Sequence, residues 1–507
     1  MRRRLIIGAI GASVAGTASA AQWTITPSLG FQELLTDNLG ATETHKQSDA
    51  ISQLMPGLDV AAQGARTNLN LSYRPIISAY IATPGQDRID QNLIGEGTFT
   101  PFENRLNIDA QIYANENSGN GNYITPAASG LVPRNQRVLD FGGTITPHYQ
   151  ERFGDVATLD AYYRVNSTNS SAQYGGSNSN TSGLSNSQLS REGNLIFGSG
   201  DSFGQLVTRI NLDHEDASGS GINTAWHSDR DVLETDYHIN FKYTISAWAG
   251  YQATRYDSTE SLLGYHQSGL TWNVAFRGAP NDTTNYSVGY GRQQGSYNAN
   301  AQINYALAPR TTVTAYYTVQ VENNLQTISA NFPFLTFNAL GQPIDLRTGL
   351  PYNPANQPFG QQNNLFRDKH ADITISHQFI RSTLALEVYN DSRDQLGGAV
   401  GNNPVSGVVG TNGTQSSTGV TLLYTREITP VVTGRADVGY VTNQFSNTGF
   451  QATGQHDQYL NFDAGLTFNI NATLSANMTY SHFRRISTFE NNSVVINELA
   501  VGITKSF

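Results

Sequence analysis

The residues of this sequence best suited to chemistry lie together at positions 213–216, in the order Asp213, His214, Glu215 and Asp216. A histidine beside carboxylates is the usual combination for general acid and base catalysis. Successive residues of an extended chain point to opposite sides, so Asp213 and Glu215 share one face and His214 lies on the other. A hydrolase needs groups that converge from different strands, and no nucleophile motif accompanies this cluster. We therefore predict no catalytic residue and no enzymatic activity.

Other kinds of site chemistry have little support in the sequence. It has no cysteine, and its ten histidines are scattered without the paired spacing of metal ligands. We predict no metal site and no cofactor. The chain has 30 basic and 40 acidic residues, and without the three arginines at its start the net charge is about −13. This balance argues against nucleic acid as a partner.

The elements that carry these residues are expected to be β-strands. The stretch INYALAPRTTVTAYYTVQV, residues 303–321, alternates apolar and polar side chains on both sides of a turn at Pro309 and Arg310. A period of two is typical of strands with one apolar face. We find about 22 such segments, within a range of about 18–26, because segment boundaries slip easily in a single sequence. Only 38% of the residues are hydrophobic yet 10% are aromatic, which excludes helical membrane proteins and disordered chains.

The start of the chain predicts export. Three arginines at positions 2–4 precede an apolar run from Leu5 to Ala15 and a small-residue site at positions 18–20. This arrangement is typical of a secretory signal peptide, and the apolar run is shorter than the roughly 20 residues of a membrane helix. We assign residues 1–20 to a signal peptide and residues 21–507 to a single transmembrane β-barrel domain.

The connections between the segments alternate in length. Tight turns, such as those at Gln63, Pro309 and Asn471, follow every second segment, and the other connections are mostly longer. Outer-membrane barrels have short periplasmic turns and long extracellular loops, whereas a soluble sandwich has no reason to separate the two kinds. We therefore predict an all-β, antiparallel, up-and-down transmembrane barrel in the outer membrane of a Gram-negative bacterium. Outer-membrane lipid and lipopolysaccharide are its expected surroundings.

The end of the chain, INELAVGITKSF, alternates as well. Leu499, Val501, Ile503 and Phe507 fall on one face, which we expect to contact lipid while the small and polar residues face the lumen. This strand resembles the C-terminal signature of outer-membrane proteins, which end in Phe and are recognised by the barrel-assembly machinery. The resemblance implies that machinery as a partner. Lys505 departs from the pattern, since its position is usually apolar or aromatic.

Several longer stretches resemble one family. They are ITPSLGFQELLTDNLG with SDAISQLMPGLDVAAQGARTNLNLSYRP, and GQPIDLRTGLPYNP leading into FRDKHADITISHQF. Together they are similar to an uncharacterised family of outer-membrane β-barrels, a β-barrel porin group associated with exopolysaccharide and PEP-CTERM sorting loci. The resemblance implies an outer-membrane location, a barrel fold and a connection to polysaccharide export. The family has no established catalytic residues to carry over.

A barrel of this size needs a constriction. About 22 tilted strands enclose a cylinder roughly 40 Å across, which would breach the membrane if left open. The strand pattern begins at Trp23, so we expect no separate plug domain of the kind found in plugged transporters. The long connection at residues 322–367 is the best candidate, and it either folds inward or packs as a cap over the outer rim. Its candidate constriction residues are Phe332, Phe334, Leu335 and Phe337.

The inner face of the barrel is expected to carry balanced charge. The predicted lumen-lining residues are Arg66, Arg74, Arg105, Asp109, Tyr113, Arg164, Arg209, Tyr316, Arg435, Asp437 and Arg485. Acids on this face are as frequent as arginines. One interpretation is a set of ion pairs that brace the wall, and the other is a pore for an anionic polymer, which needs surplus positive charge. The balance favours a neutral or weakly cationic solute, and the tyrosines either stack on sugars or belong to interface girdles.

These observations predict a porin-like channel or export conduit. Exopolysaccharide or other saccharide material is the favoured cargo, on the strength of the family resemblance alone. The competing prediction is a structural or adhesive surface barrel that conducts nothing, and an outer-membrane hydrolase is the third alternative.

Overall fold

The described part of the chain consists of long antiparallel strands joined by turns. The structure is a computed structural model that describes residues 21–118, 137–172, 186–220, 225–257, 262–323, 326, 335–337, 343–345, 365–399, 414–446, 455–488 and 493–507. Residues 1–20, assigned above to a signal peptide, lie outside these ranges. No helix within the described ranges is long and apolar enough to cross a membrane.

The strands of the first half of the chain are β1 (Gln22–Thr36), β2 (Asp49–Gln63), β3 (Thr67–Tyr73), β4 (Ile76–Tyr80), β5 (Arg88–Asp90), β6 (Asn92–Phe102), β7 (Leu106–Ser118), β8 (Arg137–Phe153), β9 (Ala157–Ala172), β10 (Asn186–Ser199), β11 (Leu206–Ser220), β12 (Trp226–Asn240) and β13 (Tyr243–Tyr256). Two short 3-10 turns, η1 (Pro84–Gln86) and η3 (Asp201–Phe203), lie between them.

The strands of the second half are β14 (Leu262–Leu263), β15 (Tyr265–Asn281), β16 (Thr284–Gln293), β17 (Ser296–Ala308), β18 (Thr311–Asn323), β19 (Leu335–Phe337), β20 (Pro343–Asp345), β21 (Leu365–Gln378), β22 (Ser382–Ala399), β23 (Thr414–Thr429), β24 (Val432–Ser446), β25 (Gln455–Asn471), β26 (Leu474–Ser487) and β27 (Val494–Ser506). Of these, β19 and β20 form a separate two-stranded sheet.

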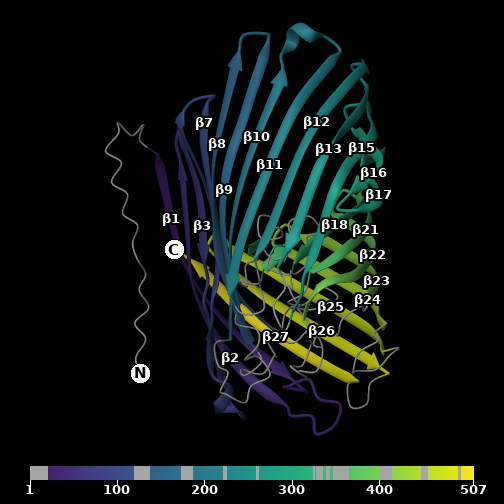
Figure 1. The fold of residues 1–507 in the computed structure, drawn as a ribbon. Coiled ribbons are helices and arrows are strands. Elements are labelled where there is room, and N and C mark those ends of the chain that lie inside the picture. Colours follow the sequence, from purple (N-terminus) through teal and green to yellow (C-terminus); the bar gives the residue numbers. More distant parts are fainter. Residues whose placement is uncertain are drawn as a thin grey trace.

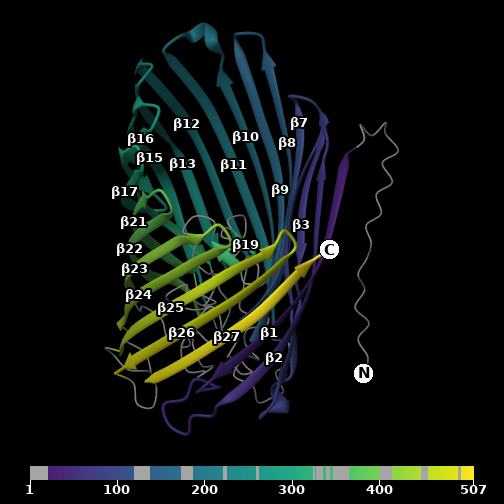
Figure 2. The same cartoon turned by 180° about the vertical axis from the view of Figure 1, so that it is seen from behind.

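The main sheet closes on itself. Each long strand pairs antiparallel with the long strands before and after it in the chain, and β1 pairs with both β2 and β27, as Figures 1 and 2 show at the purple and yellow strands. Because β4 continues β3, β5 leads into β6 and β14 is a two-residue addition, the ring has 22 strand positions. The predicted all-β, up-and-down barrel of about 22 strands is confirmed. An even number of strands also places the start of β1 and the end of β27 at the same rim.

The seam between β1 and β27 has continuous register. It runs from Ser28 opposite Ser506 to Thr36 opposite Glu498. Beyond the last pair, the Asn497 backbone N–H donates to Asp37 Oδ1 at 2.8 Å, and Asn497 Nδ2 donates to Asp37 Oδ2 at 2.6 Å. The Asp37 backbone N–H also donates to the Asn497 carbonyl oxygen at 3.2 Å, so backbone and side-chain bonds together extend the seam past its last paired residues.

The two rims differ in the length of their connections. At one rim, which we call the turn rim, strands are joined by two to six residues, as at 241–242, 309–310 and 472–473. At the other, the loop rim, connections such as 37–48 and 324–364 are longer. One loop-rim connection is short: Gln294 and Gly295, both with positive φ, join β16 to β17 in a two-residue hairpin turn. The loop rim is therefore lowest at β16 and β17.

The outward face of the barrel is apolar in the middle. Ile25, Leu29 and Phe31 of β1, and Val501 and Ile503 of β27, alternate with inward residues and expose large side chains. Neighbouring strands continue this band around the barrel, as expected of a surface that contacts lipid. The band ends at Phe507, which is 69% exposed.

Aromatic side chains border this band on both sides. Toward the loop rim, Tyr290 lies between Trp272 and Tyr297, with ring centroids 6.3 and 6.4 Å away. Toward the turn rim, Phe276 stacks on Tyr243 at 5.8 Å. Such paired girdles mark the two interfaces of a membrane, so the apolar band between them is the membrane-spanning part of the wall.

Candidate functional site

The inner face of the barrel is the candidate functional site, and ion pairs cross it between neighbouring strands. Arg164 Nη1 of β9 lies 2.7 Å from Glu192 Oε2 of β10, and the Tyr162 hydroxyl donates to Glu192 Oε1 at 2.6 Å. Arg209 Nη1 of β11 lies 2.8 Å from Asp236 Oδ2 of β12. Each arginine thus joins two strands, because residues opposite each other in an antiparallel pair share a face.

The pairing continues elsewhere around the ring. Arg74, in the break between β3 and β4, reaches Asp59 Oδ2 of β2 at 2.9 Å. Arg435 of β24 lies 3.2 Å from Asp437 Oδ1, and Asp437 stands opposite Asp463 of β25. Each of these four arginines therefore lies beside a carboxylate, while Asp437 and Asp463 bring two acids together on the same wall.

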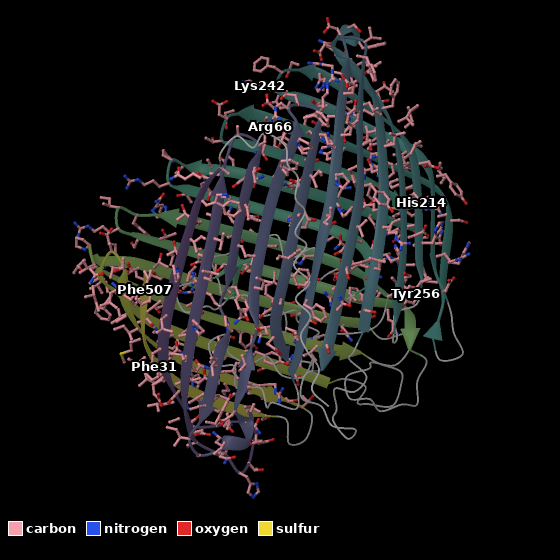
Figure 3. All side chains as sticks on the ribbon, turned by 90° about the vertical axis from the view of Figure 1, so that its left-hand side faces the viewer. Phe31, Arg66, His214, Lys242, Tyr256 and Phe507 are labelled. Atoms are coloured by element: carbon pink, nitrogen blue, oxygen red, sulfur yellow. The ribbon has the colours of Figure 1, made fainter. Side chains whose placement is uncertain are left out.

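The remaining predicted lumen-lining residues occupy different places. Arg66 and Arg105 lie in turns of the turn rim, where Arg66 Nε is 3.6 Å from Glu103 and Arg105 Nη2 is 3.5 Å from Glu151. Figure 3 shows Arg66 toward the same end of the barrel as Lys242, which is the end opposite Tyr256. The two arginines therefore lie at the turn rim and not along the wall.

The other four lie on strands. Asp109 accepts a hydrogen bond from Thr98 Oγ1 at 2.7 Å, and Tyr113 is buried and donates its hydroxyl to Thr168 at 3.0 Å. Tyr316 is exposed. Arg485 is 2% exposed, so it is covered by protein and not open to the lumen.

A hollow lies on the inner wall of β12 to β17, and we call this wall the open sector. Its volume is about 350 Å³, and it is lined by Arg230, Trp248, Asn273, Ala275, Arg277, Ser287, Gln293 and Asn300. The Arg230 guanidinium carbon lies 4.5 Å from the centre of the Trp248 ring. The hollow thus offers an aromatic plane beside amide and guanidinium groups.

A glycine helps to form this hollow. Gly289 of β16 stands between Ala275 of β15 and Asn300 of β17 in register. A Cβ at this position would lie 2.6 Å from Asn300 Oδ1 and 3.0 Å from Asn273 Oδ1. The amides can approach each other here only because the residue between them has no side chain.

A second part of the inner wall is filled with apolar side chains, and we call it the packed sector. It is formed by Leu34, Ile51, Tyr80, Tyr459, Phe483, Val494, Ile496 and Ala500, from strands β1, β2, β4 and β25 to β27. Leu34, Ile51 and Ile496 have no exposed area, although their strands place them on the inner face. The lumen is therefore occupied on this side at the loop rim.

The loop rim is also drawn inward near β16 and β17. Gln294 of the low turn donates its backbone N–H to Gln252 Oε1 of β13 at 3.0 Å, and Gln294 Oε1 accepts from the Val321 backbone of β18 at 2.9 Å. A buried apolar cluster joins the same strand ends; its members are Ala217, Trp226, Tyr256, Val321 and Leu365. Farther along, β14 pairs with β22. The ends of β11 to β13 and of β18 to β22 thus meet across the low edge.

The long connection after β18 begins inside the barrel. Gln326 Nε2 lies 3.4 Å from Glu215 Oε1, on the inner face of β11. Of the predicted constriction residues, Leu335 and Phe337 bound strand β19, which pairs with β20, while Phe332 and Phe334 lie outside the described residues. The contact of Gln326 is compatible with the inward interpretation of this connection.

The cluster at residues 213–216 divides between the two faces as its alternation predicts. Asp213 and Glu215 face inward, whereas His214 and Asp216 face outward, where they meet His227 and Asp229 of β12. The contact with His227 and Asp229 was not predicted from the sequence. The sequence does contain the repeated pattern His-x-Asp, at residues 214–216 and 227–229. It does not show the strand register that brings the two copies together.

Comparisons with known proteins agree with this architecture. Residues 405–507 match the family described as "Putative beta-barrel porin 2". The family resemblance found in the sequence is thereby confirmed. No curated protein sequence matches the chain.

Two solved structures of an iron transporter have the same overall fold. The chain is similar to the FrpB iron transporter of Neisseria meningitidis, F5-1 variant, in its apoprotein form, with a TM-score of 0.54 and 10% identity over 95% of this chain and 81% of that one. A second structure of the F5-1 variant has a TM-score of 0.54 and 11% identity, over 95% of this chain and 82% of that one. OccK2 (OpdF) of Pseudomonas aeruginosa is matched with a TM-score of 0.37 and 9% identity, over 95% of this chain and 98% of that one. The fold is that of a porin-like outer-membrane β-barrel.

Proposed function

We propose that this barrel is a passive conduit in the outer membrane of a Gram-negative bacterium. The observation that carries the proposal is the contrast between its faces: an apolar band with aromatic borders outside, and paired charges with an open hollow inside. A wall with this pattern holds water in the lumen and lipid outside. The charge pairs brace a wide ring without creating a binding site for one ion.

The solute that fits best is neutral or weakly cationic. Four arginines of the inner wall are held by acids at 2.7 to 3.2 Å, and Arg230 and Arg277 lie 3.9 and 3.7 Å from Glu234 and Asp236. Little positive charge is therefore left to attract an anionic polymer. The Trp248 hollow instead suits a saccharide, because an aromatic ring packs against the C–H face of a sugar while Asn273 and Asn300 reach its hydroxyls. Exopolysaccharide is the specific cargo that the family resemblance suggests.

Two further partners belong to this proposal. Outer-membrane lipid and lipopolysaccharide would contact the apolar band and its girdles. The barrel-assembly machinery would recognise the last strand, on which Leu499, Val501, Ile503 and Phe507 lie on the outward face. Lys505 lies on this strand, and its Nζ donates to Thr473 Oγ1 of the turn before β26 at 2.5 Å.

A structural or adhesive barrel that conducts nothing is the second candidate function. The packed sector and the inward contacts at Gln294 and Gln326 favour it, because they fill part of the lumen at the loop rim. The two functions differ in one observable, the passage of ions and small solutes through the folded barrel.

Single-channel recording in a planar bilayer tests the proposal. We expect the refolded mature protein to give steady conductance with weak cation selectivity, and added oligosaccharides to reduce it. Trp248→Ala should weaken the block of conductance by oligosaccharides. Trp272→Ala serves as the matched control, because it removes a tryptophan that lies on the outward face. A folded barrel that remains silent would support the structural function instead.

Deletion of residues 335–357 tests the role of the long connection. If this segment narrows the lumen, its removal should raise both conductance and the uptake of large antibiotics by cells. Unchanged conductance and permeability would assign the segment to the outer cap and not to the constriction.

A further inference from the structure

Four side chains form a cluster on the outward face near the loop rim of β11 and β12. The pattern His-x-Asp occurs on both strands, as His214 with Asp216 and His227 with Asp229. Residues two apart in a strand share a face. Antiparallel register then places Asp216 opposite His227 and His214 opposite Asp229, so that all four side chains converge. Figure 3 shows His214 on the side of the barrel, between the ends marked by Lys242 and Tyr256.

The four side chains are in direct contact. His214 Nδ1 lies 2.5 Å from Asp229 Oδ1, and His214 Nε2 lies 2.9 Å from Asp216 Oδ2. His227 Nδ1 lies 2.7 Å from Asp216 Oδ1, and His227 Nε2 lies 2.8 Å from Asp229 Oδ2. Donor atoms of His214, His227 and Asp229 all lie within 4.8 Å of one another. Small rotations of the rings and carboxylates would bring them to a shared centre.

The cluster lies beyond the apolar band, where water and ions have access. Ile210 and Leu212 of β11 and Leu233 of β12 form the outward surface on the turn-rim side of it. His214 is 54% exposed at its side chain. A hollow of about 450 Å³ adjoins the cluster, and His214, Asp229 and Asp231 are among its lining residues. An ion can therefore reach the four side chains from solvent.

The charges around the cluster favour the binding of a cation. Asp231 of β12 adds a third outward carboxylate to Asp216 and Asp229. Arg191 of β10 and Arg255 of β13 lie beside the cluster. Arg255 is held by Asp257 at 3.0 Å. With neutral imidazoles, the cluster and Asp231 together carry three negative charges next to these two arginines.

We propose that His214, His227, Asp216 and Asp229 form a binding site for a divalent transition metal of the Zn²⁺ type. Two imidazole nitrogens and two carboxylate oxygens are a suitable tetrahedral set for Zn²⁺, whereas Mg²⁺ and Ca²⁺ prefer ligands that are all oxygen. The site is independent of conduction, because it lies on the opposite side of the wall from the lumen. A metal bound at this site would join β11 and β12 on the turn-rim side of the connection between the two strands.

In the absence of metal, protons can hold the same four groups together. In the protonated imidazolium form both nitrogens of each ring donate to carboxylates, which ties the strands by hydrogen bonds alone. A metal must displace these protons. The hydrogen bonds to Asp229 and Asp216 raise the pKa of His214 and His227 above the ordinary histidine value, so metal binding should weaken as pH falls through that raised range. This competition separates a metal site from a purely structural ring of hydrogen bonds.

Metal titration of the refolded barrel tests the proposal. The protein should carry no polyhistidine tag and should be stripped with a chelator before Zn²⁺ is added under calorimetry. We expect one Zn²⁺ per chain at pH 7.5 and none at pH 5. His214→Ala and His227→Ala should each weaken binding more than about 100-fold, since even outer-shell changes can approach that loss. Co²⁺ at the same site should give the visible absorption of a tetrahedral complex.

His238→Ala is the matched control. His238 lies on the same strand β12 but near the turn rim, where its Nδ1 is 2.9 Å from Thr244 Oγ1. This variant should bind Zn²⁺ as the unchanged protein does, and heat-dependent mobility in gels should show that all variants fold. The proposal is overturned if the unchanged protein binds no Zn²⁺, or if His214→Ala and His227→Ala bind it as tightly as the control.

Discussion

The open sector and the packed sector are two solutions for the inner face of one barrel. Around Trp248, the inner positions of β12 to β17 carry amides and arginines that border a hollow. Around Ile496, the inner positions of β25 to β27, β1, β2 and β4 carry apolar side chains with almost no exposed area. The strands alternate in the same way in both sectors. Alternation therefore decides which residues face inward, but the inward residues decide whether that part of the lumen stays open.

The difference between the two sectors also predicts which substitutions change the stability of the barrel and which change transport through it. Side chains of the packed sector are covered, so a change there should act on folding. Side chains of the open sector line a solvent-accessible hollow, so a change there should act on what passes and leave stability nearly unaltered. Matched substitutions in the two sectors test this division.

A charge placed in the packed sector should have the strongest effect. Ile496→Asp buries a carboxylate without a partner, and we expect a loss of roughly 3–5 kcal/mol in the free energy of unfolding. Urea unfolding in lipid vesicles, followed by tryptophan fluorescence, measures it. Ser287→Asp places the same charge in the open sector and should change stability by less than about 0.5 kcal/mol. Equal losses in both variants would remove the distinction between the sectors.

A cavity in the packed sector should cost somewhat less. Leu34 has no exposed area, so Leu34→Ala should lower the free energy of unfolding by about 2–4 kcal/mol. Gln293→Ala, in the open sector, is the matched truncation and should stay within about 0.5 kcal/mol. The same unfolding measurement applies. A Leu34→Ala barrel as stable as the unchanged protein would show that this cluster does not support the wall.

A larger side chain at Gly289, in the hollow of the open sector, should weaken sugar binding. In Gly289→Val the new side chain displaces Asn273 and Asn300, and losing one hydrogen bond of about 1 kcal/mol weakens oligosaccharide block roughly fivefold. Dose-dependent block of single-channel conductance measures it. Gly193→Val is the control, because a Cβ there meets only Tyr163 Cδ2, at 3.7 Å. Block that is the same in both variants would exclude the hollow as a sugar site.

Removing a paired arginine should have the smallest effect. Arg209→Gln leaves Asp236 with less positive charge beside it, so cation preference should rise about twofold, equivalent to about 0.4 kcal/mol. Reversal potentials in a salt gradient measure it. Arg255→Gln, on the outward face beside Asp257, should leave selectivity unchanged. A fall in cation preference for Arg209→Gln would contradict the assignment of this pair to the water-filled side.

Much of the fold could be predicted from the sequence, because strand period and loop length are local. The tail from Leu499 to Phe507 shows its two faces in the residue order itself, and the structure places these residues on the outward face. The strand number follows from counting such segments. Arg66 and Arg105 show the limit of this approach, since a boundary shifted by one or two residues moves a side chain from the wall to a turn.

The sites were harder to predict, because they depend on which strands become neighbours. Alternation assigns apolar residues to lipid, yet Ile496 and Leu34 are apolar on the inner face, where they are matched by Phe483 and Ile51 across strand pairs. His214 and His227 are thirteen positions apart, and only the register of β11 with β12 brings them together. A single sequence holds the side chains of such a site but not the alignment that joins them.

The seam between β1 and β27 sets the order in which the barrel can fold. Most strand pairs join neighbours in the chain, whereas the bond between Asp37 and Asn497 spans 460 positions. Contacts of such long range require the largest loss of chain entropy and form after local ones. Hairpins should therefore assemble first into an open sheet with two unpaired edges, and the seam should close last. The hydrogen bonds of Asp37 and Asn497 are thus a marker for the final step, since only a completed ring contains them.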